Sequence, residues 1–268
     1  MRVGNRELDL VRIPKIVKAA LSSTFYRVGQ VRTIFAGPCR GLKYRIFPDM
    51  GLSPLYGGWE ADAQSLMVKH VGKGTVAYDV GANYGIHALL MARLVGSEGH
   101  VYVFEPVPAI RAELELNVAL NHFANVTCVE LAVSNECGEA QFSVNGHVGA
   151  GHFATNKSEG SSNIKVRTVT IDEFVRSGRG KPPQFMKIDV EGAESRVLSG
   201  ALEVFKQHRP TVLVDLHNPD EDRAVGAILS QSGYDAWRIK EGLTKIARLD
   251  VGWPTPDGIW GQVIALPR

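Results

Sequence analysis

Hydrophobic and polar positions change their rhythm within residues 76–94. A short apolar run with two β-branched valines, 76–80, leads into a turn with glycines at 81 and 85. Apolar residues then recur at the spacing of one helix face, at Ile86, Leu89, Leu90 and Leu94. This pattern predicts a buried strand, a tight turn and a helix.

The same alternation continues along the chain. The patterns predict strands at 100–106, 126–133, 140–144, 166–170, 185–190, 211–216, 237–240 and 259–266, and helices at 63–71, 109–120, 171–175 and 195–205. We expect Asp172 to cap the helix at 171–175. Strands that alternate with helices indicate an α/β fold, with a mainly parallel sheet covered by helices on both faces. Residues 145–163 are rich in glycine and serine, which predicts a surface loop.

The turn at 79–85 distinguishes among nucleotide-binding folds. A dinucleotide site requires G-x-G-x-x-G, but Asn83 stands where the second glycine would be, and no lysine follows Gly85 as in a P-loop. What remains is D-x-G-x-x-x-G, from Asp79 to Gly85. Backbone amides at the start of the helix would face a ligand. A carboxylate at Asp79 suits a ligand with an ammonium group, such as S-adenosylmethionine.

Glu105 ends the second strand of this pattern. In this fold class an acid at that position accepts hydrogen bonds from ribose hydroxyls. The alternative is that Glu105 only caps the helix that begins near Pro108. The position at the strand tip favours the ribose role.

Four motifs occur in order: Asp-Val-Gly-Ala-Asn-Tyr-Gly at 79–85, Phe-Glu-Pro at 104–106, Leu-Ala-Val-Ser at 131–134 and Met-Lys-Ile-Asp-Val-Glu-Gly-Ala-Glu at 186–194. Together they resemble the FkbM family of S-adenosylmethionine-dependent methyltransferases, over about residues 55–267. The resemblance implies a Rossmann-like class I methyltransferase fold. Such a fold has a mainly parallel seven-stranded sheet, helices on both faces and an antiparallel last strand.

The resemblance also implies a cofactor, S-adenosyl-L-methionine, and the residues that border it. We expect the cofactor to be held by Asp79, Gly81, Ala82, Asn83, Gly85 and Glu105, with Ala132 passing under the adenine and Glu60 at the border of the site. The acceptor that the family implies is a hydroxyl of a small molecule or glycan, such as a sugar or secondary metabolite. Residues 145–163 are expected to close over it.

Ionisable side chains share one face of the strand at 185–190. Because side chains alternate along a strand, Lys187, Asp189 and Glu191 point the same way. An ion-pair network is the structural alternative, but the position at a strand end favours catalysis. We expect Asp189 to be the general base or the acceptor anchor, Glu191 to orient Lys187 or the acceptor, and His217 to be the second candidate for the base.

No metal is assigned from the sequence. Asp189, Asp215 and His217 could together bind Mg²⁺ through oxygen and nitrogen. This hypothesis is the less favoured one, because Mg²⁺ prefers several carboxylate or phosphate oxygens.

Charge is distributed unevenly along the chain. Residues 1–47 carry ten Lys and Arg against two acids, whereas the whole chain has a net charge of +2. The pattern at 13–21 predicts an amphipathic helix, whose basic face is usually just solvated, although it could touch anionic lipid. We therefore expect a basic N-terminal helical extension or lid at 1–58 and a methyltransferase domain at 59–268. No apolar stretch is long enough to span a bilayer.

Composition bears on location and partners. The three cysteines, Cys39, Cys128 and Cys137, have no metal-binding spacing, which favours the reducing cytoplasm. No nucleic-acid partner is expected, because the basic residues cluster at the N-terminus without an RNA-binding motif. Nothing in the sequence indicates the oligomeric state.

Two other function classes remain open at this stage. An NAD-dependent oxidoreductase on a Rossmann-type fold would share the strand, turn and Glu105, but Asn83 at the second glycine position counts against it. A non-catalytic nucleotide-binding module would not need the ionisable face of Lys187, Asp189 and Glu191. The S-adenosylmethionine-dependent methyltransferase is therefore the favoured prediction.

Overall fold

A computed structural model describes residues 29–47, 51–145, 151–153, 161–239, 242–249 and 261–268. The amphipathic helix expected at 13–21 lies outside these residues. So do most of the residues of the loop expected at 145–163, and the side chains at 151–153.

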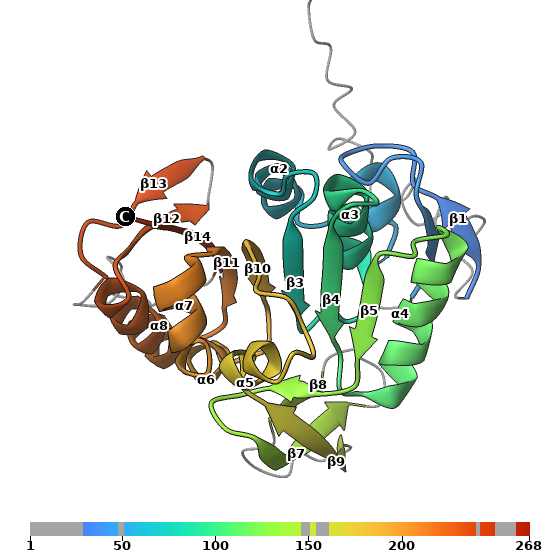
Figure 1. Ribbon diagram of the computed structural model, residues 1–268. Coiled ribbons are helices and arrows are strands. Elements are labelled where there is room, and N and C mark those ends of the chain that lie inside the picture. The colour runs from blue at the N-terminus through green and yellow to red at the C-terminus, as the bar shows by residue number, and fades with distance from the viewer. Residues whose placement is uncertain (1–28, 48–50, 146–150, 154–160, 240–241, 250–260) are drawn as a thin grey trace, which may run out of the picture.

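The described part of the main sheet has eight strands. They are β3 (Val76–Val80), β4 (His100–Phe104), β5 (Val126–Val129), β10 (Phe185–Ile188), β11 (Thr211–Leu216), β12 (Tyr234–Ile239), β13 (Leu243–Lys245) and β14 (Gly261–Pro267). Figure 1 shows how they are arranged. Their order is β13-β12-β14-β11-β10-β3-β4-β5. Neighbours from β5 to β11 pair in parallel, and β14 runs antiparallel to β11 and β12. The mainly parallel sheet with an antiparallel last strand is thus confirmed.

The strand count differs from the expected seven because β13 adds an edge strand. It pairs antiparallel with β12, and all three of its residues are exposed. A three-residue exposed strand has no apolar alternation, so the sequence pattern carried no signal for it.

Helices cover both faces of this sheet, and alternate strand residues face each set. Tyr78, Met186 and Ile188 pack on one face with α5 (Ile171–Arg176), α6 (Glu194–Ser199), α7 (Leu202–His208) and α8 (Pro219–Gln231). Ala77 and Phe185 pack on the other with α2 (Ala61–His70), α3 (Ile86–Val95) and α4 (Pro108–Leu120). Lys187 shares the face of Phe185.

Two helix predictions need correction. The helix expected at 195–205 is divided into α6 and α7 at Gly200, where a Cβ would lie 2.2 Å from the carbonyl oxygen of Ser134. Thr170, not Asp172, caps α5 by accepting the amide of Glu173. Asp172 instead accepts two amides at the start of α7, those of Glu203 and Val204. Asp172 does cap a helix N-terminus, but tertiary packing decides which helix that is.

A second sheet lies beyond the carboxyl ends of β3, β4 and β5 (Figure 1). It contains β6 (Ala132–Val133), β7 (Gly138–Asn145), β8 (Gly151–Phe153) and β9 (Ser161–Val169), in the order β6-β9-β7-β8. The strand expected at 126–133 is therefore two strands, β5 and β6, in different sheets. Within the stretch expected to be a loop, β8 and the start of β9 are strands that extend this sheet.

The described part of the N-terminal extension packs on the main domain. Strands β1 (Val31–Thr33) and β2 (Lys43–Arg45) pair antiparallel, and the short 3-10 helix η3 (Ser53–Tyr56) precedes α2. Ile34, Tyr44 and Phe47 are buried in the same apolar cluster as α2 and α3. Asn117 of α4 and Asn121, the residue that follows the helix, also accept backbone amides of β2. A separate unit at 1–58 stays a prediction.

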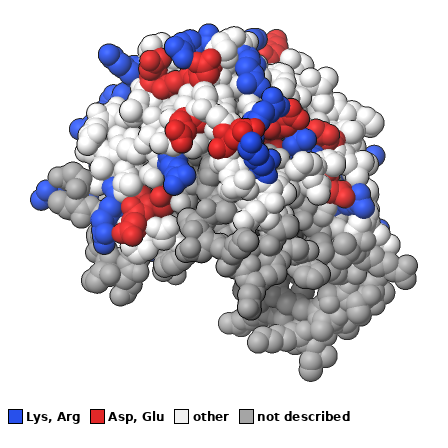
Figure 2. Space-filling view, turned by 90° about the horizontal axis from the view of Figure 1, so that it is seen from below, with Lys and Arg blue, Asp and Glu red and all other residues white. Residues whose placement is uncertain are grey.

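Two further features of the described residues concern membrane crossing and surface charge. None of the described helices combines the length and apolar character that crossing a membrane would need. Figure 2 views the molecule from the side of the second sheet, and in its described part basic and acidic side chains are interspersed.

Gly81 lies where β3 turns beside the end of β10. Its φ is +79°, and a Cβ would lie 1.8 Å from the backbone oxygen of Asp189. We expect Gly81→Ala to lower the free energy of unfolding by the left-handed cost of about 1–2 kcal/mol plus about 1–3 kcal/mol of overpacking. Gly74→Ala is the control, because Gly74 has a φ of +76° with no atom near the added Cβ. Equal losses in urea denaturation would contradict this packing role.

Candidate active site

A cavity opens at the carboxyl ends of the central strands, between the two sheets. It is lined by Val80, Gly81, Asn83, Phe104, Glu105, Pro106, Leu131, Ala132, Val133, Phe142, Asp189, Val190 and Glu191. Six of the residues expected from the sequence are among them. The other six, Asp79, Glu60, Lys187, His217, Ala82 and Gly85, are not. Ala82 is buried and donates its amide to Phe104, and Gly85 precedes α3 as its cap.

The turn after β3 is shaped by left-handed backbone at three residues. Gly81, Asn83 and Gly85 have φ values of +79°, +49° and +87°. Asparagine tolerates this region better than most residues, which is why it can replace a glycine here. The turn thereby directs the Asn83 amide at Glu105, with 3.1 Å from N to Oε2.

Glu105 links this turn to the start of α4. Its Oε2 accepts the amide of Asn83, and its Oε1 accepts the amide of Val107 at 2.9 Å. Burial raises the pKa of Glu105 to about 7, against the two amides, which act downward. The carboxylate both braces the backbone and lines the cavity, so the cap-like contact and the ribose role are compatible in geometry.

Asp79 is completely buried at the end of β3. Neither of its carboxylate oxygens has a hydrogen-bond partner among the described residues. Burial raises its pKa to about 6, and Lys187 acts in the opposite direction. A buried acceptor without a hydrogen-bond donor is costly. Asp79 is not among the residues that line the cavity, and the cation that acts on it in the structure is Lys187.

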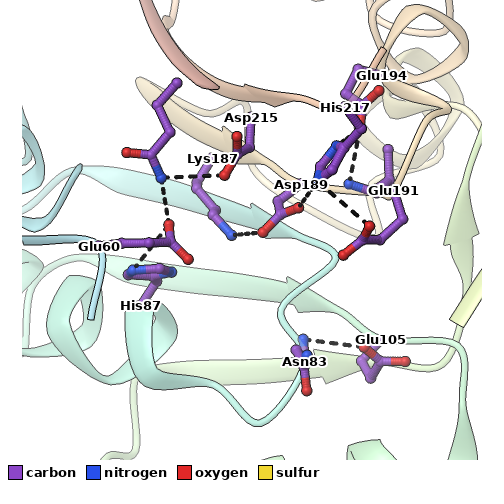
Figure 3. A network of polar contacts seen from close by, with 12 residues as sticks. Glu60, Asn83, His87, Glu105, Lys187, Asp189, Glu191, Glu194, Asp215 and His217 are labelled. Carbon is purple, nitrogen blue, oxygen red and sulfur yellow. Dashed lines mark hydrogen bonds and ion pairs between the residues drawn. The ribbon is translucent and has the colours of Figure 1, made fainter. Parts of the chain in front are cut away.

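Lys187 is the cation of the central network in Figure 3. Its Nζ lies 2.8 Å from Oδ2 of Asp189, and its side chain is 5% exposed. Burial lowers the pKa of Lys187, but the carboxylates of Asp189, Glu60 and Asp79 outweigh this and the net shift is upward. For Asp189 burial acts upward, yet Lys187 makes the net pKa shift downward. The pair is therefore charged, with Asp189 a carboxylate facing the cavity.

Glu60 lies beside this network rather than in the cavity wall. Its Oε2 accepts a hydrogen bond from Gln262 at 2.6 Å and lies 3.7 Å from Nε2 of the buried His87. Gln262 also donates to Asp215 at 3.3 Å. Burial raises the pKa of Asp215 to about 6 and raises that of Glu60 as well. Neither Gln262 nor His87 was among the expected site residues. Gln262 reaches this network because of the order of the strands, and His87 reaches it from α3.

His217 follows β11 and is surrounded by carboxylates. Its Nδ1 lies 2.9 Å from Glu194 Oε1, and its Nε2 lies 3.5 Å from Asp189 Oδ1 and 3.6 Å from Glu191 Oε2. Burial lowers the pKa of His217, but Glu194 and Asp189 outweigh it and raise the pKa to about 9. His217 is thus an imidazolium at neutral pH, so the ordinary pKa that made it a second candidate for the base does not apply.

Glu191 and Ala132 occupy different settings from those expected. Glu191 lies beside His217 and not beside Lys187, because it follows β10 with a left-handed φ of +54°. Ala132 belongs to β6 of the second sheet, yet it lines the cavity. Phe142 of β7 lines the same wall and was not expected. The apolar alternation of β7 could have suggested an inward Phe142, but not what it faces.

Two groups of described side chains have ligand atoms within 4.8 Å of one another, a spacing that a metal ion could bridge. One is Asp189, Glu191 and His217, and the other is Glu60, Asp189 and Asp215. The hypothetical Mg²⁺ set of Asp189, Asp215 and His217 is therefore divided between them. Lys187 already pairs with the shared Asp189, which provides a cation without a metal.

Comparison with known proteins places the chain in a family. The family model described as the methyltransferase FkbM domain matches residues 79–236. The chain belongs to the FkbM methyltransferase family. It is accordingly an S-adenosylmethionine-dependent methyltransferase with a class I fold. This decides against the NAD-dependent oxidoreductase and the non-catalytic module.

Individual relatives are distant. The hexuronic acid methyltransferase AglP of Haloferax volcanii is 28% identical over 191 residues, which are 70% of this chain and 73% of AglP. Methyltransferase sdnD of Sordaria araneosa is 25% identical over 191 residues, 60% of this chain and 73% of sdnD. The crystal structure of methyltransferase FkbM from Methylobacillus flagellatus has a TM-score of 0.47 and 16% identity, over 72% of this chain and 43% of that one.

The residues present fit the family's cofactor. S-adenosylmethionine carries an ammonium and a sulfonium, and the unpartnered Asp79 carboxylate is an acceptor for such a cation. Glu105 lies in the cavity at the second strand tip, where ribose hydroxyls bind in this fold class. The cofactor would supply the methyl group, and this chain supplies its orientation.

The buried Lys187–Asp189 ion pair can be compared with an exposed ion pair that has the same distance from nitrogen to oxygen. We expect Lys187→Met to destabilise the fold by about 3–5 kcal/mol, because it leaves buried carboxylates without their cation. Lys245 pairs with Asp235 at the same 2.8 Å but is 55% exposed. Lys245→Met should cost only about 0–1 kcal/mol. Urea denaturation of both variants measures the difference, and similar losses would mean that the Lys187 pair does not stabilise the buried network.

Proposed function

We propose that this methyltransferase methylates a hydroxyl oxygen of a sugar or a sugar-containing metabolite. The observation that carries the proposal is the Asp189 carboxylate, which is charged, held by Lys187 and in the wall of the same cavity as Glu105. A cofactor bound near Glu105 and an acceptor near Asp189 would share that cavity. The name of the relative AglP, a hexuronic acid methyltransferase, supports a sugar as the acceptor.

The chemistry fits a direct displacement. Methyl transfer from a sulfonium requires the acceptor oxygen in line with the methyl group, and alignment alone can contribute about 7–11 kcal/mol. Asp189 would accept the hydrogen bond of the acceptor hydroxyl and receive its proton as the new bond forms. A general base of this kind typically contributes about 10²–10⁴-fold. Lys187 keeps Asp189 ionised and fixed, and Glu191 offers a second carboxylate on the same side of the cavity.

The charge of the cavity supports this cofactor over a dinucleotide. Its described lining contains three acids, Glu105, Asp189 and Glu191, and neither Lys nor Arg. A pyrophosphate would be repelled there, whereas a sulfonium and an ammonium would be attracted. Placement of the remaining site residues, Asp79, Gly81, Asn83 and Ala132, against the cofactor is part of the same proposal.

Glu105 is tested by cofactor affinity. We expect Glu105→Gln to weaken binding of S-adenosylmethionine and S-adenosylhomocysteine about 10- to 100-fold, because a charged acceptor for ribose hydroxyls is lost. Isothermal titration calorimetry measures both ligands. Glu139→Gln is the control, since Glu139 is exposed on β7 and pairs with Lys165. Unchanged affinity in the folded Glu105 variant would remove this residue from the ribose site.

Asp189 is tested by turnover on a panel of sugar and metabolite hydroxyls. We expect Asp189→Asn to lower kcat about 10²- to 10⁴-fold with cofactor affinity within a few fold of wild type, because proton acceptance is lost while asparagine keeps an oxygen for Lys187. Asp235→Asn, at an exposed pair, should retain full turnover. Near wild-type turnover of Asp189→Asn would show that Asp189 is not the base.

A further inference from the structure

Glu194 is a motif residue to which neither the sequence pattern nor the proposed reaction gives a role. It is the first residue of α6 and is completely buried. It does not line the cavity. A buried carboxylate needs partners, so its contacts indicate what it does.

One oxygen of Glu194 connects α6 with the turn after β10 and with the residue that follows β11. Oε1 lies 2.9 Å from Nδ1 of His217 and accepts the amide of Gly192 at 3.0 Å and that of Val190 at 3.4 Å. The amides belong to the turn between β10 and α6, which carries Glu191. The imidazole belongs to the residue after β11. Glu194 therefore ties the end of β11 to the turn that forms the acceptor side of the cavity.

This contact fixes the orientation of His217. With Nδ1 on Glu194, the opposite nitrogen Nε2 faces Asp189 and Glu191, the two carboxylates in the cavity wall (Figure 3). The charged groups that act on His217 from neighbouring elements are Glu194 of α6, Asp189 and Glu191 after β10, and Asp215 of β11.

We propose that Glu194 is a positioning residue that acts through His217. It holds the imidazole as a fixed cation whose Nε2 edge attracts the carboxylates of Asp189, at 3.5 Å, and Glu191, at 3.6 Å, and keeps them beside the acceptor. Burial raises the pKa of Glu191 and the charge of His217 acts against this rise, so the fixed imidazolium favours the carboxylate form that can accept a hydrogen bond from an acceptor hydroxyl. The kinetic part of this inference rests on the proposed function, whereas the effect on His217 does not.

The test compares Glu194→Gln with wild type. Glutamine keeps an oxygen for Nδ1 and the two amides but removes the charge, so the geometry is retained and the proton on His217 is held less strongly. We expect the NMR titration of the His217 ring to shift down by about one pH unit or more. If the pKa of His217 falls from about 9 to about 8, turnover relative to wild type should be unchanged at pH 6, about twofold lower at pH 8 and about fivefold lower at pH 9, because the neutral fraction of His217 grows. Cofactor affinity should stay within about twofold.

Glu221→Gln is the matched control. Glu221 lies in α8 and accepts the amide of Ser195 in α6 at 2.7 Å, so it braces the same helix without contacting His217. It should leave the His217 titration and the pH profile unchanged. A Glu194→Gln variant whose turnover falls equally at every pH, with the His217 titration unmoved, would reduce Glu194 to a structural residue and overturn the proposal.

A double-mutant cycle gives a second criterion. If Glu194 acts through His217, adding Glu194→Gln to His217→Gln should change kcat less than about twofold, and fully additive losses would overturn the proposal. If Glu194→Gln fails to fold, the NMR titration of His217 in the wild-type protein still tests the inference. A His217 that titrates near its ordinary pKa would contradict it. The NMR titration needs no acceptor. An intact His217 effect without transfer to any sugar hydroxyl would refute the proposed function and leave this inference standing.

Discussion

The site depends on one buried ammonium placed among carboxylates. Lys187 lies on β10, a central strand of the main sheet, and the carboxylates of Asp189, Glu60 and Asp79 all interact electrostatically with its ammonium group. Moving such groups from water into the interior is costly unless they compensate one another. Each carboxylate of the cluster is therefore tolerated because Lys187 is there. Lys187 keeps its charge, in turn, because the carboxylates surround it.

This constraint explains the asymmetry of the two sheet faces. On the face of α5 to α8, the central strands carry mainly apolar side chains such as Tyr78, Met186 and Ile188, which make a continuous core. The opposite face is apolar near the amino ends and becomes ionic toward the carboxyl ends, at Asp79, Lys187 and Asp215. Stability is thus supplied mainly by packing, and the strand ends are free to carry groups that pair with each other and with ligands.

The parallel core of the fold and part of the site follow from local pattern. Alternation along β10 is enough to place Lys187 and Asp189 on one face, and the glycine turn is enough to locate α3. Pattern fails where the outcome depends on which strands become neighbours. Gln262 meets Glu60 and Asp215 only because β14 inserts between β11 and β12. The change from β5 to β6 occurs at Glu130 and Leu131, where a single charged residue interrupts a mostly apolar stretch, so hydrophobicity alone did not divide the two strands. Glu191 leaves the face of Lys187 because the strand has already ended there.

The cavity wall is contributed by two sheets that differ in kind. Glu105 and Asp189 extend from the parallel sheet, whereas Ala132 and Phe142 come from the smaller sheet of β6 to β9. In the main sheet, β4 and β10 are each hydrogen-bonded to a neighbouring strand on both sides, so their positions tolerate little change. The second is mostly antiparallel, joined by local connections and lies at the rim. Substitutions in the rim strands can therefore change which ligands fit the cavity without altering the residues that carry the charge. Such a division lets one fold acquire new substrates without rebuilding its chemistry.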